Sequence, residues 1–139
     1  MNIVYLLSHH DTVINLRMNC VIISVIYNIV YFAVPGQVKN LTLIPYPHRI
    51  NVTWMKPILH SYCVTQYVID WVHTEIGSNS TKNVSSDANS VLIEDLDACV
   101  EYEVSVRAMN EGDESTGAVT GNMKTQSVGN YHTQIILLY

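Results

Sequence analysis

The chain has 139 residues, of which 48% are hydrophobic and only 14% are charged. This length holds one ordinary domain with a short appendage, and the composition is too apolar for an intrinsically disordered protein. Seven Lys and Arg residues stand against 12 Asp and Glu residues, a formal net charge of −5. This balance excludes a protein that grips the phosphate backbone of nucleic acids through a basic surface.

An uncharged apolar segment dominates the N-terminal part of the chain. Residues 20–34 read CVIISVIYNIVYFAV and follow Arg17. This run is shorter than the roughly 20 residues that a transmembrane helix needs, but it matches the apolar region of about 7 to 15 residues in a secretory signal peptide. Ala33 and Gly36 offer small residues for a cleavage site. We therefore expect residues 1–34 to contain a signal peptide that is removed on export.

The apolar part of this leader begins deeper in the chain than in an ordinary signal peptide. A signal peptide starting at Met18 would have ordinary proportions. Residues 1–17 would then be a non-native extension or a misassigned start. Two alternatives remain: the segment is retained as a membrane signal anchor, or it forms a buried element of the folded domain.

Four N-glycosylation acceptor triplets support export. Each has the form Asn-x-Ser or Asn-x-Thr without proline in the middle position. Two lie in the polar stretch 75–89, where a loop would expose them, and two lie where alternation points the Asn side chain outward. The acceptors are Asn40, Asn51, Asn79 and Asn83.

Residues 35–125 show strand and turn patterns in nearly every stretch. Apolar residues alternate with polar ones in short runs, and this period of two predicts strands with one buried face. Pro45 and Pro47 are expected to end the first run and Pro57 the second, since proline cannot donate to a sheet ladder. Residues 75–89, rich in Ser and Asn, are expected to form a loop. The apolar positions of the runs are Val38, Leu41 and Leu43; Ile50, Val52 and Trp54; Tyr67, Ile69 and Trp71; Val91, Ile93 and Leu96; Tyr102, Val104, Val106 and Ala108; and Val119 and Met123.

No stretch shows the apolar spacing that an amphipathic helix requires. Short strands separated by turn signals over about ninety residues predict an all-β fold, an antiparallel β-sandwich. We expect this domain to cover residues 35–125. A tail, residues 126–139, follows it, and the apolar end of this tail is too short to span a bilayer.

The order and spacing of these landmarks resemble the fibronectin type III family over nearly all of residues 35–125. The matching stretches include residues 50–54 (INVTW), 67–71 (YVIDW) and 102–108 (YEVSVRA). The family often has Pro where Ala98 stands and Thr or Ser where Val100 stands, and neither departure removes the fold.

The resemblance implies seven strands in two sheets of three and four, with immunoglobulin-like topology. It places Trp54 in the core on the second strand. It also implies that Leu96 and Tyr102 form a tyrosine corner, in which the phenol bonds to a backbone group a few residues upstream. Tyr67 and Trp71 then complete an aromatic core whose burial offsets the ordering entropy of short strands.

Cys20 would leave with the signal peptide, so the mature chain would keep Cys63 and Cys99. A bridge between these two would stabilise the domain by roughly 3–4 kcal/mol on the chain-entropy model, and receptor ectodomains of the family have similar-looking cysteines. The family topology nevertheless implies a separation on the order of 20 Å, whereas a disulfide needs Cα atoms within about 7 Å. A bridge, free thiols and pairing with another chain remain as alternatives.

The loop between the last two strands is where adhesive members of the family display Arg-Gly-Asp to integrins. Here residues 110–115 read NEGDES, with Glu111, Gly112 and Asp113 at the centre. Glu111 replaces the required arginine and reverses its charge, so no integrin binding through this loop is expected. The loop remains a candidate contact for another protein.

Eight of the 12 acidic residues lie between positions 94 and 114, opposed only by Arg107. They are expected to form a solvated acidic face. The alternative is a docking patch for a basic partner, whose binding would weaken with salt. The eight are Glu94, Asp95, Asp97, Glu101, Glu103, Glu111, Asp113 and Glu114.

The sequence contains no pattern typical of an enzyme. Neither a Gly-rich phosphate loop nor a nucleophile elbow occurs, and His60 with Cys63 lacks a second pair at zinc-binding spacing. No catalytic residue, cofactor or metal site is therefore predicted.

These features, with the resemblance, predict a secreted, glycosylated module that acts by protein–protein recognition, with an unknown extracellular protein as its partner and no nucleic acid. The alternative is a fragment of a multidomain transmembrane receptor, such as a receptor tyrosine phosphatase or a cell-adhesion receptor, in which this domain is a spacer. A membrane is involved only in that case, or if the apolar segment is retained.

Overall fold

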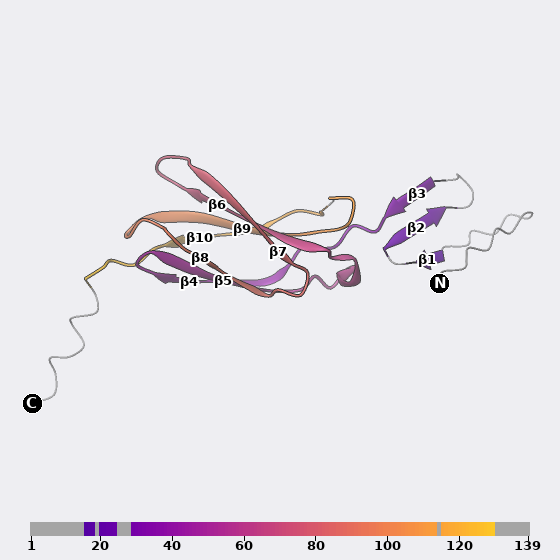
Figure 1. The fold of residues 1–139 in the computed structure, drawn as a ribbon, viewed down its shortest axis with the longest axis horizontal. Helices are drawn as coiled ribbons and strands as arrows, with labels where there is room; N and C mark the ends of the chain where they lie inside the picture. The colour runs from indigo at the N-terminus through magenta and orange to yellow at the C-terminus, as the bar shows by residue number, and fades with distance from the viewer. Residues whose placement is uncertain (1–15, 19, 25–28, 114, 130–139) are drawn as a thin grey trace, which may run out of the picture.

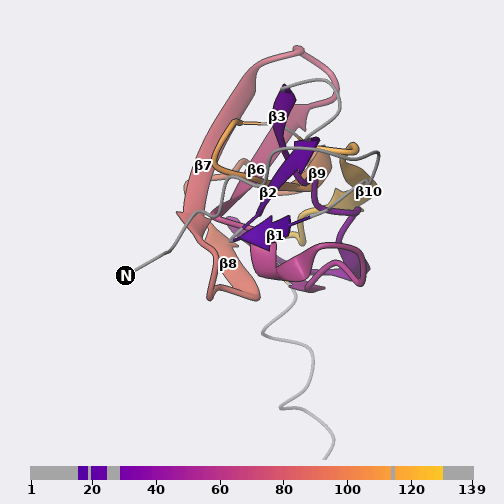
Figure 2. The same cartoon turned by 90° about the vertical axis from the view of Figure 1, so that its right-hand side faces the viewer.

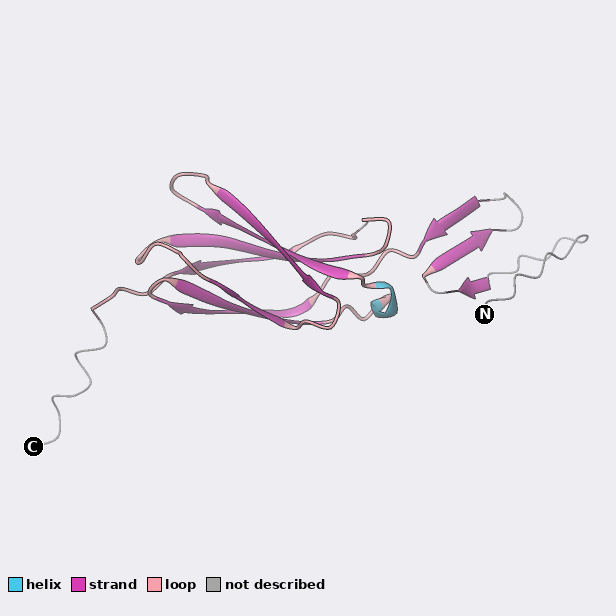
Figure 3. Ribbon diagram, viewed as in Figure 1, coloured by secondary structure: helices cyan, strands magenta, loops and turns pink. Residues whose placement is uncertain are grey.

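The structure is a computed structural model that describes residues 16–18, 20–24, 29–113 and 115–129. Within these residues the regular elements are strands and one short 3-10 turn (Figures 1 and 3). In chain order they are β1 (Leu16–Met18), β2 (Val21–Ser24), β3 (Ile29–Phe32), β4 (Lys39–Tyr46), β5 (Arg49–Met55), η1 (Ser61–Cys63), β6 (Gln66–His73), β7 (Asn79–Ser85), β8 (Ser90–Ile93), β9 (Glu101–Met109) and β10 (Val119–Lys124).

Seven of these strands form the two layers of a sandwich (Figure 1). One layer has the strand order β4-β5-β8 and the other has the order β10-β9-β6-β7, with every neighbouring pair antiparallel. Strand β10 also contacts β4, which closes the sandwich along one side. The predicted seven-stranded antiparallel sandwich, with sheets of three and four, is confirmed.

Alternating burial along the strands produces the core between the layers. In β9 every second residue from Tyr102 to Ala108 is at most 5% exposed, while Glu101 and Glu103 face solvent. This pattern is what a strand with one covered face requires. The buried core consists of Val38, Ile50, Val52, Trp54, Val64, Tyr67, Ile69, Val91, Ile93, Leu96, Tyr102, Val104, Val106 and Ala108.

Trp54 of β5 and Tyr67 of β6 join the two layers at the centre of the core. Trp54 is 3% exposed and Tyr67 is fully buried. Their rings meet edge to face with the centroids 5.2 Å apart, a contact that adds to the stabilisation from buried apolar area. Trp71 is only half-buried and packs against the margin of the core. The prediction that it belongs to the core is therefore only partly correct.

Tyr102 fixes the turn that leads into β9. Its phenol oxygen accepts a hydrogen bond from the main-chain N–H of Asp97 at 3.0 Å. Leu96 is buried, and its N–H donates to the carbonyl of His48 at 3.0 Å. The buried ring of His73 packs against the Tyr102 ring with 5.3 Å between centroids. The turn therefore has the tyrosine-corner contact that the resemblance implied.

The prediction of a loop over residues 75–89 is wrong, because β7 lies within it. Strand β7 pairs with β6, with Thr81 opposite Asp70 and Val84 opposite Tyr67. It is an edge strand (Figure 2), and Val84 alone among its residues is half-buried. A strand exposed on both faces lacks apolar alternation, so its sequence resembles a loop.

Pro45 lies inside β4 and does not end the first strand as predicted. It pairs with Ile50, and the strand continues to Tyr46, before Pro47. Strand β4 has β5 as its only neighbour within its sheet. Proline is tolerated on such an edge strand because one side of the strand has no ladder to complete.

Strands β1, β2 and β3 form a separate three-stranded antiparallel sheet over part of the predicted leader. Export and cleavage of this segment stay predictions. Residues 1–15 of the leader and 130–139 of the tail lie outside the described residues. Among the residues that are described, no helix has the length and apolar character needed to cross a bilayer.

The segment that precedes β4 contacts the sandwich at several points. Cys20 Sγ donates to the carbonyl of Tyr62 at 3.3 Å, and Ala33 is buried. The N–H of Gly36 donates to the carbonyl of Leu59 at 2.9 Å. A cleavage after Gly36 would separate the contacts of residues 33–36 from the domain, and the position of a cut stays a prediction. The carbonyls of Ala33, Val34 and Pro35 are hydrogen-bonded by Asn110, His60 and Thr116 at 3.4, 2.9 and 2.9 Å, respectively.

Candidate protein-interaction surface

Large apolar side chains gather around the loop between β5 and β6. Among the described residues, seven large hydrophobic side chains are exposed, and four of these fall within positions 55–62. Ile58, at 85%, is the most exposed of the seven. Single exposed apolar residues are ordinary on protein surfaces, whereas a group of them marks an interaction site. We call Met55, Ile58, Leu59 and Tyr62 the β5–β6 apolar cluster.

Buried residues near both ends of this loop hold it in place. Pro57, two residues after the end of β5, is buried, and Cys63 and Val64 are buried at and after the turn η1. His60 takes a left-handed φ of 50°, and its ring Nδ1 lies 2.9 Å from the carbonyl oxygen of Val34. A loop anchored in this way loses little further entropy when a partner binds to it.

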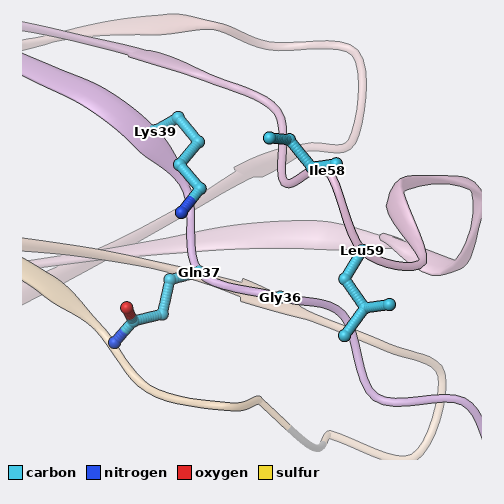
Figure 4. A pocket seen from close by; sticks show the side chains of 5 residues that line it. All are labelled: Gly36, Gln37, Lys39, Ile58 and Leu59. Atoms are coloured by element: carbon cyan, nitrogen blue, oxygen red, sulfur yellow. The ribbon is translucent and has the colours of Figure 1, made fainter.

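A pocket with a volume of about 240 Å³ lies beside the cluster (Figure 4). Ile58 and Leu59 line one side of it. Lys39 and Gln37 lie on the other side, and the backbone of Gly36 runs between them. A Cβ at Gly36 would lie 3.2 Å from the Cβ of Leu59, so a larger residue would push the loop outward. Small-molecule sites have volumes of about 300–1,000 Å³, so this pocket suits a partner side chain better than a metabolite.

A second pocket, of about 310 Å³, lies at the opposite end of the sandwich beside the β4–β5 turn. Arg49 is the cation in the lining of this pocket, and its guanidinium already lies over the Tyr46 ring, 4.9 Å from the centroid. Val128 is the one strongly exposed apolar residue in its lining. It therefore lacks the concentration of apolar side chains that surrounds the first pocket.

The predicted contact loop with Glu111, Gly112 and Asp113 lies at the same end of the sandwich as the β5–β6 apolar cluster. The Gly112 N–H donates to Asn110 Oδ1 at 3.0 Å, and Gln66 Nε2 donates to Asp113 Oδ1 at 3.4 Å. Gln66 begins β6 directly after the β5–β6 loop, so the two loops are neighbours. The structure thus places the predicted loop beside a cluster that sequence reasoning missed.

The acidic residues between positions 94 and 114 are spread along β9 and the turns at its two ends. Strand β9 has nine residues, a length of about 30 Å. Glu94, Asp95 and Asp97 precede β9, while Glu111 and Asp113 follow it at the other end. Glu114 lies outside the described residues. A docking patch made of all these residues would extend along the whole strand, on which Glu101 and Glu103 are also exposed. Docking of a basic partner stays a prediction.

Arg107 is paired with an acid outside that segment. Its Nη2 lies 3.1 Å from Asp70 Oδ2, and the hydroxyl of Thr81 donates to Asp70 Oδ1 at 2.6 Å. These side chains stand on β9, β6 and β7 on the outer face of the four-stranded sheet. The ion pair joins the two inner strands β9 and β6, and the Thr81 hydrogen bond ties the edge strand β7 to β6.

Cys63 and Cys99 are free thiols, so the alternative of a bridge between them is wrong. Cys63 is buried beside the β5–β6 loop, whereas Cys99 is exposed in the turn before β9, at the other end of the sandwich. Burial raises the pKa of the Cys63 thiol to about 12, and neighbouring Cys20 adds to the shift. The buried thiol is therefore protonated at neutral pH and unreactive.

The Cys63 thiol should make the domain less stable at alkaline pH. In the unfolded chain the thiol ionises from its ordinary pKa of 9.0, whereas in the fold it stays protonated up to about 12. Between these values the unfolded state binds fewer protons. The free energy of unfolding should therefore fall by about 1.4 kcal/mol per pH unit from this group. Chemical denaturation at successive pH values measures the slope.

The matched variant for this measurement is Cys63→Ala. Its free energy of unfolding should fall less steeply than that of the wild type over the first pH unit of the window, whatever the stability of the variant at neutral pH. Equal slopes would show that the fold does not hold the Cys63 thiol in its protonated form.

All four predicted glycosylation acceptors lie in strands. Asn79 and Asn83 are exposed on the edge strand β7, not on a loop as expected. Asn40 is exposed in β4 next to a bulge, with a φ of 50°. Asn51 is half-buried in β5, which is paired on both sides. The structure thus offers three accessible acceptors and a less accessible fourth.

Glycosylation of the accessible acceptors should be visible in electrophoresis of the full chain from eukaryotic secretory cells. A deglycosidase should increase the mobility of the wild type. Asn79→Gln and Asn83→Gln should each remove one step of that shift, while Asn51→Gln should remove none, because Asn51 is half-buried. The absence of any shift in the wild type would contradict passage through the secretory pathway.

In the part of the chain that the structure describes, no three His, Cys, Asp or Glu side chains are grouped so that they could hold a metal ion. The nearest approach to catalytic geometry is His73, whose Nε2 lies 3.8 Å from Asp97 Oδ2. The His73 ring is buried against Tyr102 in the tyrosine corner, where it packs as part of the fold.

Two antiparallel sheets of three and four strands, with a core tryptophan and a tyrosine corner, define an immunoglobulin-like sandwich. The family model of the fibronectin type III domain matches residues 36–120. The match covers more than half of the chain, and the chain belongs to the fibronectin type III family.

Solved structures of the family have the same fold. The fn3 domain of human collagen alpha-1(XX) is 25% identical, with a TM-score of 0.57 over 66% of this chain and 88% of that one. A two-domain segment of chicken tenascin is 21% identical, with a TM-score of 0.62 over 70% of this chain and 54% of the segment. The FN1–FN3 domains of chicken CNTN1 are 19% identical, with a TM-score of 0.61 over 71% and 36%. Comparison with curated proteins gives no significant match.

Domains of this family are common in extracellular adhesion proteins and receptors. They generally serve there as non-catalytic modules that bind other proteins or space neighbouring domains.

Proposed function

We propose that this protein is an extracellular, non-catalytic recognition module that binds another protein through the β5–β6 apolar cluster. The observation that carries the proposal is the exposure of Ile58, Leu59 and Tyr62, at 85%, 56% and 59%. Ile58 and Leu59 line a pocket of side-chain size. Burying such side chains against a partner releases ordered water and contributes most of the affinity at the centre of protein interfaces.

Secretion is the localisation that the sequence favours. An uncharged run of signal-peptide length precedes the domain, and exposed Asn-x-Ser/Thr acceptors lie on β4 and β7. The family membership points to the same compartment. Cell-surface placement follows instead if the apolar run is retained.

The binding proposal is tested with the full chain, displayed as a multimer, on an array of extracellular proteins expressed on cells. A protein that binds the wild type should lose at least about ten-fold in affinity for the double variant Ile58→Ser and Leu59→Ser, since buried apolar anchors at interfaces are worth this much or more. The control is Ile76→Ser, because Ile76 is 71% exposed in the turn between β6 and β7, at the other end of the sandwich. Unchanged binding of the double variant would contradict the proposed surface.

A second candidate function is that of a spacer in a multidomain receptor. It is favoured by the similar structures from tenascin and CNTN1, which are segments of two or more domains. In that case the apolar cluster, beside the incoming chain at Ala33, would pack on a preceding domain. Sequencing of the full transcript tests it: further repeats or a membrane span in the same reading frame favour the spacer.

A further inference from the structure

We propose that the pocket beside the β5–β6 apolar cluster receives an apolar side chain of a protein partner, and that a neighbouring Asp or Glu of the partner pairs with Lys39. The partner contact is then an acidic-apolar segment of another protein. This inference rests on the proposed recognition function, because it specifies what the same surface recognises.

The charges of the chain are divided along its length. Of the 12 acidic residues, Asp11 alone precedes Asp70. Strands β4 and β5 and the β5–β6 loop therefore contribute only positive charges, although the net charge of the chain is −5. An acidic partner is attracted to this part of the domain and repelled by most of the rest. The charged residues between the two acids are Arg17, Lys39, Arg49 and Lys56.

Lys39 is the charged residue that lines the pocket (Figure 4). It begins β4 opposite Met55, a member of the apolar cluster. Its ammonium group has no ion pair or hydrogen bond within the described part of the chain. Lys56 differs, because Asp87 Oδ1 lies 4.0 Å from its Nζ. The uncompensated charge at the pocket therefore belongs to Lys39.

An unpaired ammonium at the edge of an apolar pocket discriminates between ligands. A carboxylate next to the inserted side chain forms a charge-assisted hydrogen bond with it in a partly dehydrated site. A basic neighbour would be repelled, and an apolar one would leave the exposed ammonium of Lys39 hydrated, without the gain from an ion pair. Lys39 thus adds a requirement for charge to the requirement for apolar shape.

The acidic residues at this end of the domain direct the partner toward Lys39. Glu111 and Asp113 are exposed in the neighbouring β9–β10 loop, and their charges repel a carboxylate that approaches from that side. A sulfated polysaccharide is disfavoured as the ligand, because a polyanion needs several cations side by side and the pocket offers one.

The test is a displayed library of short random peptides, selected on the immobilised full chain. The wild type should enrich peptides with Leu, Ile, Met or Phe next to Asp or Glu. Lys39→Glu should keep the apolar residue and replace its acidic neighbour by Lys or Arg, and Lys39→Gln should lose the preference for charge. Lys82→Glu, an exposed charge reversal on β7, is the matched control and should select the same peptides as the wild type.

The contribution of Lys39 is measured with a synthetic copy of an enriched peptide. The affinity of this peptide for Lys39→Gln should be about two- to five-fold lower than for the wild type, the range of a partly exposed ion pair. The difference should shrink as salt is added. Circular dichroism of each variant checks that the fold is intact.

The outcomes separate this inference from the proposed function on which it rests. Enrichment of apolar residues without an acidic neighbour, sensitive to Leu59→Ser, overturns the role of Lys39 and leaves the recognition surface in place. Enriched peptides whose binding does not change in Leu59→Ser overturn the surface itself. Retention of the chain on immobilised heparin with no enriched peptide identifies a polysaccharide ligand and overturns both.

Discussion

Trp54→Ala should lower the free energy of unfolding by about 3–5 kcal/mol, the range for truncation of a buried large aromatic residue. Trp54 is 3% exposed and its ring packs edge to face against Tyr67 at 5.2 Å. The remaining side chains of the two sheets cannot collapse fully into the space left by the indole, so the loss includes a cavity as well as buried area. Since domains are stable by about 5–15 kcal/mol, the variant should be close to unfolding at physiological temperature.

Urea denaturation followed by circular dichroism measures this loss, with Trp71→Ala as the matched variant. Trp71 is a tryptophan of the adjacent layer but is only half-buried, so its truncation should cost clearly less, about 1–2 kcal/mol. A loss below about 1 kcal/mol for Trp54→Ala would contradict its position at the centre of the core. Similar losses for both variants would show that the two rings contribute equally to the core.

The parts of the fold that were predictable from sequence are those in which one face of a strand is covered. In β5 and β9 the burial of every second residue imposes an apolar-polar alternation, and this alternation is visible without coordinates. Strand β7 has no covered face, so its sequence, NSTKNVS, carries no such pattern. It is a strand because its backbone pairs with β6 and because Thr81 donates a hydrogen bond to Asp70 of that strand.

The candidate surface was harder to predict, because exposure within a loop is a tertiary property. The β5–β6 loop contains the apolar residues Ile58, Leu59, Cys63 and Val64. The first two are exposed and the last two are buried. Two aliphatic residues after Pro57, outside any alternating run, were a usable signal. Which of the four apolar residues are buried depends on the left-handed turn at His60 and on the 3-10 turn that follows it.

The second large effect is expected at the tyrosine corner. Tyr102→Ala should cost about 3–5 kcal/mol through the loss of a buried ring, and Tyr102→Phe should cost about 1–3 kcal/mol. In the Phe variant the ring is kept, but the Asp97 N–H loses the phenol oxygen that accepts its hydrogen bond at 3.0 Å. The ring of His73, which packs against the Tyr102 ring at 5.3 Å between centroids, is kept in contact with the Phe ring.

Hydrogen exchange of the Tyr102→Phe variant reports on the turn itself, whereas the free energy of unfolding reports on the whole domain. The amide of Asp97 should exchange faster than in the wild type by more than the global loss of stability accounts for, because its acceptor is gone. Tyr46→Phe is the matched control: Tyr46 is half-buried and meets Arg49 through its ring, which the variant keeps, so it should cost less than about 0.5 kcal/mol. Equal costs for the two Tyr→Phe variants, with unchanged exchange at Asp97, would mean that the Tyr102 hydroxyl does not fix the turn. The order of the strands would then depend on ring packing alone.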